Sequence, residues 1–320
     1  MKAIVQDRYG GPEILELRDI EPPAIGTGEV LIRVRASSIN PADWHVIRGR
    51  PFVVRLSGYG VRRPKRAVPG TDVAGVVEAV GADVTTVRPG DEVFGFGRSA
   101  WAELATARAD LLRPRPVNLD FVQAAAVPLA AVTALQGLRD AGRLQPGQRV
   151  LVIGASGGVG TFAVQIAKLM GAEVTGVCRT RKLELVSSLG ADHVIDYTRD
   201  DYLGRKARYD LIFQLAGTAS PLSFRRTLGR TGTLVLSSGD GHLSGIDRIV
   251  VAKAASRMTS QRLDTFLAHQ DGDDLASLWA MLEAGSVRPV IDRVHPLREA
   301  AAAMRYAEAG HTQGKVIMTV

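Results

Sequence analysis

Three glycines at every third position form the most informative pattern in the chain. They are Gly154, Gly157 and Gly160, and they follow an apolar strand pattern that begins at Arg149. The first glycine permits a tight turn, the second lets a ligand approach the backbone, and the third allows a helix to pack closely on its strand. Free N–H groups at the start of that helix would face phosphates. The spacing therefore predicts a site for the pyrophosphate of a dinucleotide.

The elements around this turn follow from hydrophobic spacing. Apolar residues recur at steps of three and four along one helical stripe: Val159, Phe162, Ala163, Ile166, Ala167 and Met170. Gly171 is suited to end the helix. A second strand pattern over residues 172–178 completes the strand–helix–strand unit that the glycine motif requires.

A second interpretation of the same turn is a hydrolase. Gly154, Ser156 and Gly158 also fit G-x-S-x-G, the nucleophile elbow, which likewise lies between a strand and a helix. That motif has no need of Gly157 or Gly160, and it makes no use of the residues that close the second strand.

The residues that close the second strand are basic and hydroxylated. They are Arg179, Thr180, Arg181 and Lys182. A site selective for NAD usually has an acidic residue here for the ribose hydroxyls, whereas a 2′-phosphate requires cations and hydroxyl donors. The sequence therefore favours NADPH over NADH. The alternative is that these charges only begin a solvated helix.

Composition indicates an ordinary globular protein. The length of 320 residues suggests two domains, and 46% hydrophobic and 23% charged residues are typical of folded chains. The richest apolar stretch, 121–138, is interrupted by Gln123, Pro128, Thr133 and Gln136, so no membrane segment is predicted. The N-terminal apolar run is too short for a signal peptide, and we expect a cytoplasmic protein without a membrane partner.

Charge and cysteine content limit which partners and which metal sites the chain is expected to have. A net charge of +7 is modest for this length and predicts no nucleic-acid partner. A single cysteine, Cys178, excludes a disulfide within the chain and a four-thiolate zinc site. The six histidines show no metal-ligand spacing.

One segment is strongly basic. Residues 44–71 contain no Asp or Glu but seven cations: Arg48, Arg50, Arg55, Arg62, Arg63, Lys65 and Arg66. Such a run is typical of a solvated loop. The alternative is a basic entrance to a binding site, which would attract a phosphate-bearing cofactor or an acidic substrate.

The two halves of the chain differ in the order of their predicted strands and helices. Strand patterns at 29–35, 73–80, 91–96 and 101–106 predict an antiparallel barrel or sandwich, with two helices flanking Pro128. From Arg149 onward, strands predicted at 150–154, 172–178, 193–196, 211–215 and 233–236 alternate with helices, which predicts a parallel sheet. Right-handed crossovers would bring the glycine turn and residues 215–218 and 236–239 to one carboxyl edge. The end of the chain is predicted as strand 288–297, helix 298–310 and strand 314–320, the last returning to the first domain.

The whole chain resembles a known family. Residues 37–50, 69–81, 89–97, 124–138, 154–197 and 314–320 resemble, in order, the zinc-free medium-chain dehydrogenase/reductases of the quinone-oxidoreductase-like branch. The resemblance implies an α/β Rossmann domain with a doubly wound parallel sheet, plus a GroES-like, mostly antiparallel β-barrel domain. Residues 1–120 and 286–320 would form the GroES-like catalytic domain, and residues 121–285 the NADP-binding Rossmann domain.

The resemblance also assigns site residues. It implies that Asn40 and Asp43 line the active cleft, that Thr133 touches the nicotinamide or its ribose, and that Lys315 approaches the cofactor. Tyr59 joins Asn40 as a candidate polar contact to substrate, and the proton donor is left open among Tyr59, Asp43, His45 and water. The full predicted cofactor set is Asn40, Thr133, Gly154, Ser156, Gly157, Gly158, Val159, Gly160, Arg179, Thr180, Lys182, Leu215, Ala216, Gly217, Ser237, Ser238 and Lys315.

The zinc ligands of related enzymes are replaced here. Ile39 and Asn40 stand where those enzymes carry a cysteine, and Gly70 to Asp72 where they carry a histidine. Without a Lewis acid, quinones and conjugated enones are the natural hydride acceptors. We therefore expect a zinc-independent NADPH reductase of such substrates, a homodimer by resemblance. A zinc-free alcohol or carbonyl dehydrogenase and a non-catalytic NADPH-binding or RNA-binding protein are the alternatives.

Overall fold

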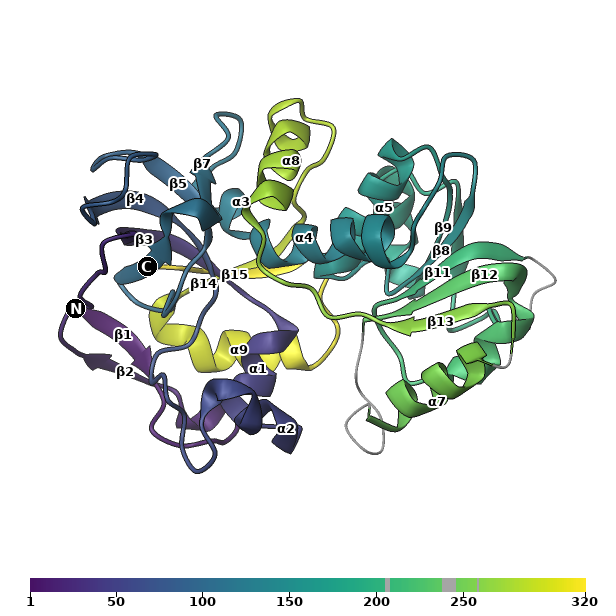
Figure 1. The fold of residues 1–320 in the computed structure, drawn as a ribbon, viewed down its shortest axis with the longest axis horizontal. Coiled ribbons are helices and arrows are strands. Elements are labelled where there is room, and N and C mark those ends of the chain that lie inside the picture. The colour runs from purple at the N-terminus through teal and green to yellow at the C-terminus, as the bar shows by residue number, and fades with distance from the viewer. Residues whose placement is uncertain (205–207, 238–245, 258) are drawn as a thin grey trace. The chain divides into compact units, whose positions relative to one another are not determined.

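The structure is a computed structural model that describes residues 1–204, 208–237, 246–257 and 259–320. The chain divides into two compact units, and each is described by itself (Figure 1). Unit 1 comprises Met1–Val132, Gln270–Gly285 and Pro289–Val320. Unit 2 comprises Thr133–His269 and Ser286–Arg288. None of the helices in the described ranges combines the length and apolar character needed to cross a bilayer.

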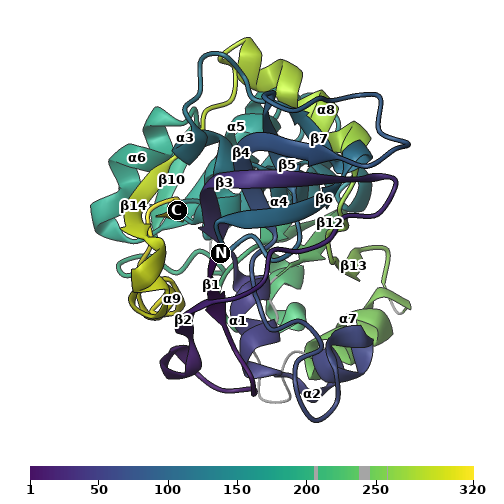
Figure 2. The same ribbon diagram turned by 90° about the vertical axis from the view of Figure 1, so that its left-hand side faces the viewer.

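Unit 1 is built on a mostly antiparallel sheet. Its order is β14-β15-β3-β4-β5-β7, and β6 also pairs with β3. The strands are β3 (Glu29–Ile39), β4 (Asp72–Val80), β5 (Glu92–Phe96), β6 (Leu104–Arg108), β7 (Leu112–Pro114), β14 (Ile291–Pro296) and β15 (Lys315–Thr319). A separate hairpin of β1 (Lys2–Val5) and β2 (Glu16–Asp19), visible at the N-terminus in Figure 2, was not predicted.

The last strand returns to the first part of the chain, as the sequence predicts. β15 pairs antiparallel with β3, so that Val316 lies opposite Ile39. This register brings Lys315, at the head of β15, next to the end of β3. The helices of this unit are α1 (Pro41–Arg48), α2 (Phe52–Val54), α3 (Phe121–Ala125), α8 (Gly272–Glu283) and α9 (Ala300–Glu308); α4 (Pro128–Gln136) continues into unit 2.

Unit 2 is a six-stranded parallel sheet of order β10-β9-β8-β11-β12-β13. Counted along the chain from β8, this is the order 3-2-1-4-5-6 of a dinucleotide-binding fold, which confirms the predicted class. The strands are β8 (Arg149–Ile153), β9 (Glu173–Cys178), β10 (His193–Asp196), β11 (Tyr209–Gln214), β12 (Leu228–Leu236) and β13 (Arg262–Thr265). The helices are α5 (Gly158–Leu169), α6 (Leu183–Ser188) and α7 (Ile246–Arg257).

Several expectations differ from the structure. The segment 197–204, between β10 and β11, forms turns instead of the expected helix, and a 3₁₀ segment, Pro221–Arg226, joins β11 to β12. β13 was not predicted. The compact units also differ from the expected boundaries, because α3 packs on β3 and β4, and α8 packs on β7, which places both helices in unit 1.

Candidate functional site

The glycine turn in unit 2 has the backbone that its sequence predicts. Gly154 has φ +85°, and a Cβ there would lie 2.8 Å from the Cβ of Ala216, so the turn after β8 touches the segment after β11. A Cβ on Gly160 would lie 2.1 Å from the carbonyl oxygen of Gly154. Only glycine therefore lets α5 pack this closely on the turn. The first and third predicted glycine roles are confirmed.

Gly157 differs from both neighbours because the space beside it is open. A Cβ there would meet only the Gly154 carbonyl oxygen, at 3.4 Å. Gly157 precedes α5, whose first N–H groups, on Gly158 to Gly160, have no partner inside the helix. An open, Cβ-free approach to a helix N-terminus fits a pyrophosphate. Among the other turn residues, Ser156 is buried and Val159 is half-buried.

Two polar side chains, Gln214 and Arg248, form hydrogen bonds to the segment after β11. The Gln214 amide donates to the carbonyls of Ala216 and Gly217. The buried guanidinium of Arg248, on α7, donates to Gln214 Oε1 at 2.5 Å and to the carbonyls of Gly217 and Ala219. This leaves Ala216 and Gly217 exposed and Leu215 half-buried at the carboxyl edge of the sheet.

The next strand ends at the same edge. Leu236 pairs with Gln214, and Ser237 N donates to the Gln214 carbonyl at 3.0 Å. The predicted convergence of the strand ends is therefore confirmed up to Ser237. Ser238, also predicted to contact cofactor, lies outside the described residues.

The basic group after β9 is only partly available. Arg179 is half-buried, and its Nε lies 3.2 Å from the Tyr197 hydroxyl. The Thr180 hydroxyl donates to the Asp196 carboxylate at the end of β10, and this bond, with others from Thr198, lowers the pKa of Asp196. Lys182 is buried. Of the predicted basic residues, Arg181 is exposed, and Arg179 is the half-buried cation that directly follows β9.

A buried polar network occupies the junction of β3, β4 and β15 in unit 1. Asn40, Asp72 and Lys315 are each at most 3% exposed. Lys315 Nζ donates to Asn40 Oδ1 at 2.5 Å and lies 3.6 Å from Asp72 Oδ2. Asn40 Nδ2 donates to the same Asp72 oxygen at 2.9 Å. Because an ammonium only donates and a carboxylate only accepts, these partners fix the orientation of the Asn40 amide.

The donors of this network are directed inward. Asn40 Nδ2 faces Asp72 and also Ser38 Oγ, at 3.4 Å, and Lys315 Nζ also donates to the Ile39 carbonyl at 3.2 Å. Asp72 accepts in addition from Ser38 Oγ at 2.5 Å and from Leu129 N at 3.0 Å. Asn40 therefore has no spare donor for a developing oxyanion.

Asp43 joins the network through the start of α1. Its Oδ2 accepts from Asn40 N at 2.7 Å, which is one half of a capping box. Burial raises the pKa of Asp43 to about 7, and the neighbouring Asp72 carboxylate adds to the rise. Burial also lowers the pKa of Lys315, against the opposing effect of the two carboxylates. At neutral pH, Asp43 can therefore hold or release a proton.

This raised pKa predicts a pH-dependent stability. The folded state binds the Asp43 proton more tightly than the unfolded chain, so stability falls as pH rises from about 3.8 to about 7. Asp43→Asn keeps an acceptor for Asn40 N but cannot ionise. We expect its stability relative to wild type to increase by a few kcal/mol across this window. Urea unfolding at several pH values measures the difference, and parallel curves for both proteins would contradict it.

The structure unites some predicted residues and not others. Asn40, Asp43 and Lys315 share one network, whereas Tyr59 is 39% exposed and, within the described residues, shares no hydrogen bond or ion pair with it. His45 Nδ1 lies 3.1 Å from the Arg50 carbonyl oxygen. Thr133 is buried on α4 of unit 2.

Sequence reasoning missed four residues that build these sites: Ser38, Asp72, Gln214 and Arg248. An acidic residue at the head of the apolar pattern of β4 was an available signal for Asp72. Nothing local in the sequence distinguishes Arg248, because it donates to Gln214, Gly217 and Ala219, which lie far from it in the chain.

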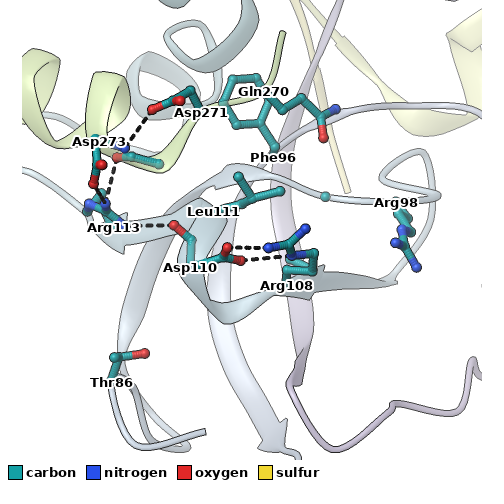
Figure 3. Close-up of a pocket in the computed structure, with 13 residues that line it drawn as sticks. Thr86, Phe96, Arg98, Arg108, Asp110, Leu111, Arg113, Gln270, Asp271 and Asp273 are labelled. Atoms are coloured by element: carbon teal, nitrogen blue, oxygen red, sulfur yellow. Dashed lines mark hydrogen bonds and ion pairs between the residues drawn. The ribbon is translucent and has the colours of Figure 1, made fainter.

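Unit 1 also has a surface hollow of about 720 Å³ between β5, β6 and the start of α8 (Figure 3). Its charged side chains largely pair with one another or with backbone. Arg108 pairs with Asp110, and Arg113 donates to the Gly272 carbonyl at 2.5 Å. No residue of the buried network lines the hollow, and we assign it no ligand. In the described part of the chain, no three His, Cys, Asp or Glu side chains are grouped to hold a metal.

Comparison with known protein families covers most of the chain. Residues 26–116 match the alcohol dehydrogenase GroES-like domain, and residues 189–318 match the family described as zinc-binding dehydrogenase.

Individual relatives align over nearly the full length. The chain is 32% identical to the chloroplastic quinone oxidoreductase of Triphysaria versicolor, covering 99% of this chain and 98% of the relative. It is 35% identical to the chloroplastic NADPH-dependent alkenal/one oxidoreductase of Arabidopsis thaliana, covering 99% and 79%. The solved quinone oxidoreductase of Coxiella burnetii has a TM-score of 0.88 and 31% identity, covering 100% of this chain and 99% of that one.

Proposed function

The chain belongs to the quinone-oxidoreductase-like branch of the medium-chain dehydrogenase/reductases, and from this premise we propose that it is an NADPH-dependent reductase of quinones or conjugated enones. The observation that carries the proposal is the glycine turn, which is open at Gly157 and closed at Gly154 and Gly160. Relatives named for quinone and for alkenal/one reduction support the substrate class. Ser156 then belongs to a phosphate-binding turn and is not a nucleophile.

We propose that the dinucleotide is held by unit 2. Gly157 and the first N–H groups of α5 would take the pyrophosphate, and residues 215–217 and Ser237 would line the same carboxyl edge. Arg179 would pair with the 2′-phosphate, which selects NADPH over NADH. When bound, the reduced nicotinamide supplies the hydride.

The buried network of unit 1 would keep its own side chains in fixed orientations and would hold a proton that can be released. Lys315 and Asp72 hold the Asn40 amide in one orientation. Since Asn40 has no free donor, we assign the hydrogen bond to the substrate oxygen to the Tyr59 hydroxyl. Asp43, with a pKa of about 7, is the group of this network that we propose stores a proton.

A substrate panel tests the function. We expect aerobic NADPH consumption with a quinone or an enone, and no loss of rate after treatment with a metal chelator. Turnover of alcohols or aldehydes alone would indicate a carbonyl dehydrogenase. NADPH binding without any turnover would indicate a binding protein, and a rate that depends on added zinc would contradict the zinc-independent mechanism.

Arg179→Ala tests the choice of cofactor. Loss of a charge-assisted contact to the 2′-phosphate should weaken NADPH binding roughly 10- to 100-fold and leave NADH binding nearly unchanged. Fluorescence titration with both nucleotides measures the effect. The matched control is Arg199→Ala, since Arg199 lies 3.7 Å from Asp196 and is mostly exposed. Equal losses for NADPH and NADH would remove the argument for selectivity.

Tyr59→Phe tests the proposed hydrogen-bond donor. Tyr59 is 39% exposed, and its hydroxyl makes no hydrogen bond within the described ranges, so thermal stability should be unchanged. We expect kcat/KM for an enone to fall roughly 100-fold while NADPH affinity is retained. Steady-state kinetics check this result, and an unchanged kcat/KM would return the role to water or another side chain.

A further inference from the structure

The segment 52–66 of unit 1, here called the basic arm, exposes apolar side chains that the proposed chemistry does not explain. Phe52, Val53, Leu56 and Val61 are between 48% and 62% exposed. They are four of the thirteen large apolar side chains that are exposed in the described residues. Phe52, Val53 and Leu56 follow the i, i+1, i+4 spacing of one helix face, and they precede the kink at Ser57 and Gly58, where the backbone leaves the helical conformation. A concentration of this kind marks an interaction surface.

Cations surround this apolar face. Arg62, Arg63, Lys65 and Arg66 are all exposed, and residues 44–71 contain no acidic side chain. None of these four has an ion pair with a described residue. The arm therefore presents an apolar face beside an uncompensated positive charge.

The arm is fixed to its unit and is not a loose loop. The Tyr9 hydroxyl donates to the Gly60 carbonyl at 2.5 Å and lies 3.0 Å from the Tyr59 carbonyl oxygen. The Arg55 guanidinium lies 4.3 Å from the centre of the Tyr9 ring and 5.7 Å from that of Phe52, and its Nε donates to the Gly49 carbonyl. These contacts hold the backbone of the arm in place. Its apolar side chains are nevertheless exposed. Figures 1 and 2 both show α2 at the lower end of unit 1, away from β4 and β5.

We propose that the basic arm docks on an anionic lipid surface. Apolar side chains enter the boundary between head groups and acyl chains, while Arg and Lys pair with anionic head groups. A second copy of the chain is a poor occupant, because two arms face to face would oppose their cations. This proposal departs from the expectation of no membrane partner, which rested on the lack of a predicted spanning segment, whereas a surface contact needs no such segment.

Lipid docking would serve the proposed function, on which this step rests. Quinones and enones with apolar substituents dissolve in bilayers, and the arm carries Tyr59, the proposed hydrogen-bond donor. Docking would bring that hydroxyl to the surface where such substrates are concentrated.

Vesicle co-sedimentation of the full chain tests the proposal. We expect binding to vesicles of phosphatidylcholine with phosphatidylserine, weak binding to phosphatidylcholine alone, and loss of binding at high salt. Leu56→Asp should lower the apparent affinity roughly tenfold, and the double variant Arg62→Gln/Arg63→Gln roughly 30-fold. The matched control is Val117→Asp, since Val117 is 85% exposed on the same unit, and it should bind as wild type does.

Several results would overturn the lipid assignment. Absence of binding to the anionic vesicles, or equal losses for Leu56→Asp and Val117→Asp, would do so. Arm-dependent binding of polyglutamate without vesicle binding would assign the arm to an acidic protein, and a change of sedimentation mass in Leu56→Asp would assign it to a second copy. A circular dichroism melt checks that each variant is folded. Turnover of a water-soluble quinone separates the two proposals: its absence in wild type counts against the reductase function only, whereas normal turnover without vesicle binding counts against docking only.

Discussion

Replacing Gly157 with Ala should lower NADPH affinity roughly 30-fold without destabilising the protein. The backbone at Gly157 is extended, with φ −83° and ψ 177°, so alanine can adopt it. Its Cβ would meet only the Gly154 carbonyl oxygen, at 3.4 Å, and would otherwise enter the space proposed for the pyrophosphate. A steric cost of about 2 kcal/mol against the ligand corresponds to this loss. Isothermal titration with NADPH, together with a thermal melt, measures both quantities.

Gly160→Ala is the matched variant, and it should differ from Gly157→Ala in losing stability as well as NADPH affinity. Its Cβ would lie 2.1 Å from the Gly154 carbonyl oxygen, and both atoms belong to rigid elements, so α5 must shift. We expect a loss of about 1–3 kcal/mol in stability in addition to weaker NADPH binding. Because all three tryptophans, Trp44, Trp101 and Trp279, lie in unit 1, far-UV circular dichroism is the suitable probe for this change in unit 2. Unchanged NADPH binding by Gly157→Ala would refute the proposed pyrophosphate site.

Replacing Lys315 with Met should destabilise unit 1 by about 3–5 kcal/mol. The change leaves the Asp72 carboxylate buried beside Asp43 with no cation, and it removes the donor to Asn40 Oδ1. Methionine has a similar length and is apolar, so a packing defect contributes little. Urea unfolding followed by tryptophan fluorescence reports directly on unit 1.

The control is an exposed ion pair in the same unit. Arg48 lies 2.7 Å from Glu308, and its side chain is 42% exposed, so Arg48→Met should cost less than about 1 kcal/mol. The double variant Lys315→Met/Asp72→Asn should recover part of the loss, because it removes the buried charge as well as its partner. Additive losses from the two single changes would show that the network is not coupled.

The sequence predicted unit 2 more completely than unit 1. In unit 2, hydrophobic periodicity and glycine spacing are local signals, and the βαβ handedness rule adds that the ends of the parallel strands meet at one edge of the sheet. The turn, α5 and most of the parallel strands follow from these signals. The prediction of a helix between β10 and β11 was wrong, because the alternation of strands with helices along the chain does not specify the structure of each connecting segment. β13 was missed because its four residues, Arg262–Thr265, carry little apolar pattern.

By itself, the sequence determined the class of each half, the glycine turn after β8 and the basic residues after β9, because each of these is encoded by neighbours within a few positions. Only the tertiary structure decided how polar side chains are paired. Lys315 meets Asn40 across 275 positions, and Asp72 meets Asn40 across 32, through the registers of β15 on β3 and of β3 on β4. Burial at that junction then sets the proton affinity of Asp43, because desolvation depends on everything that surrounds a group and not on its neighbours in the chain.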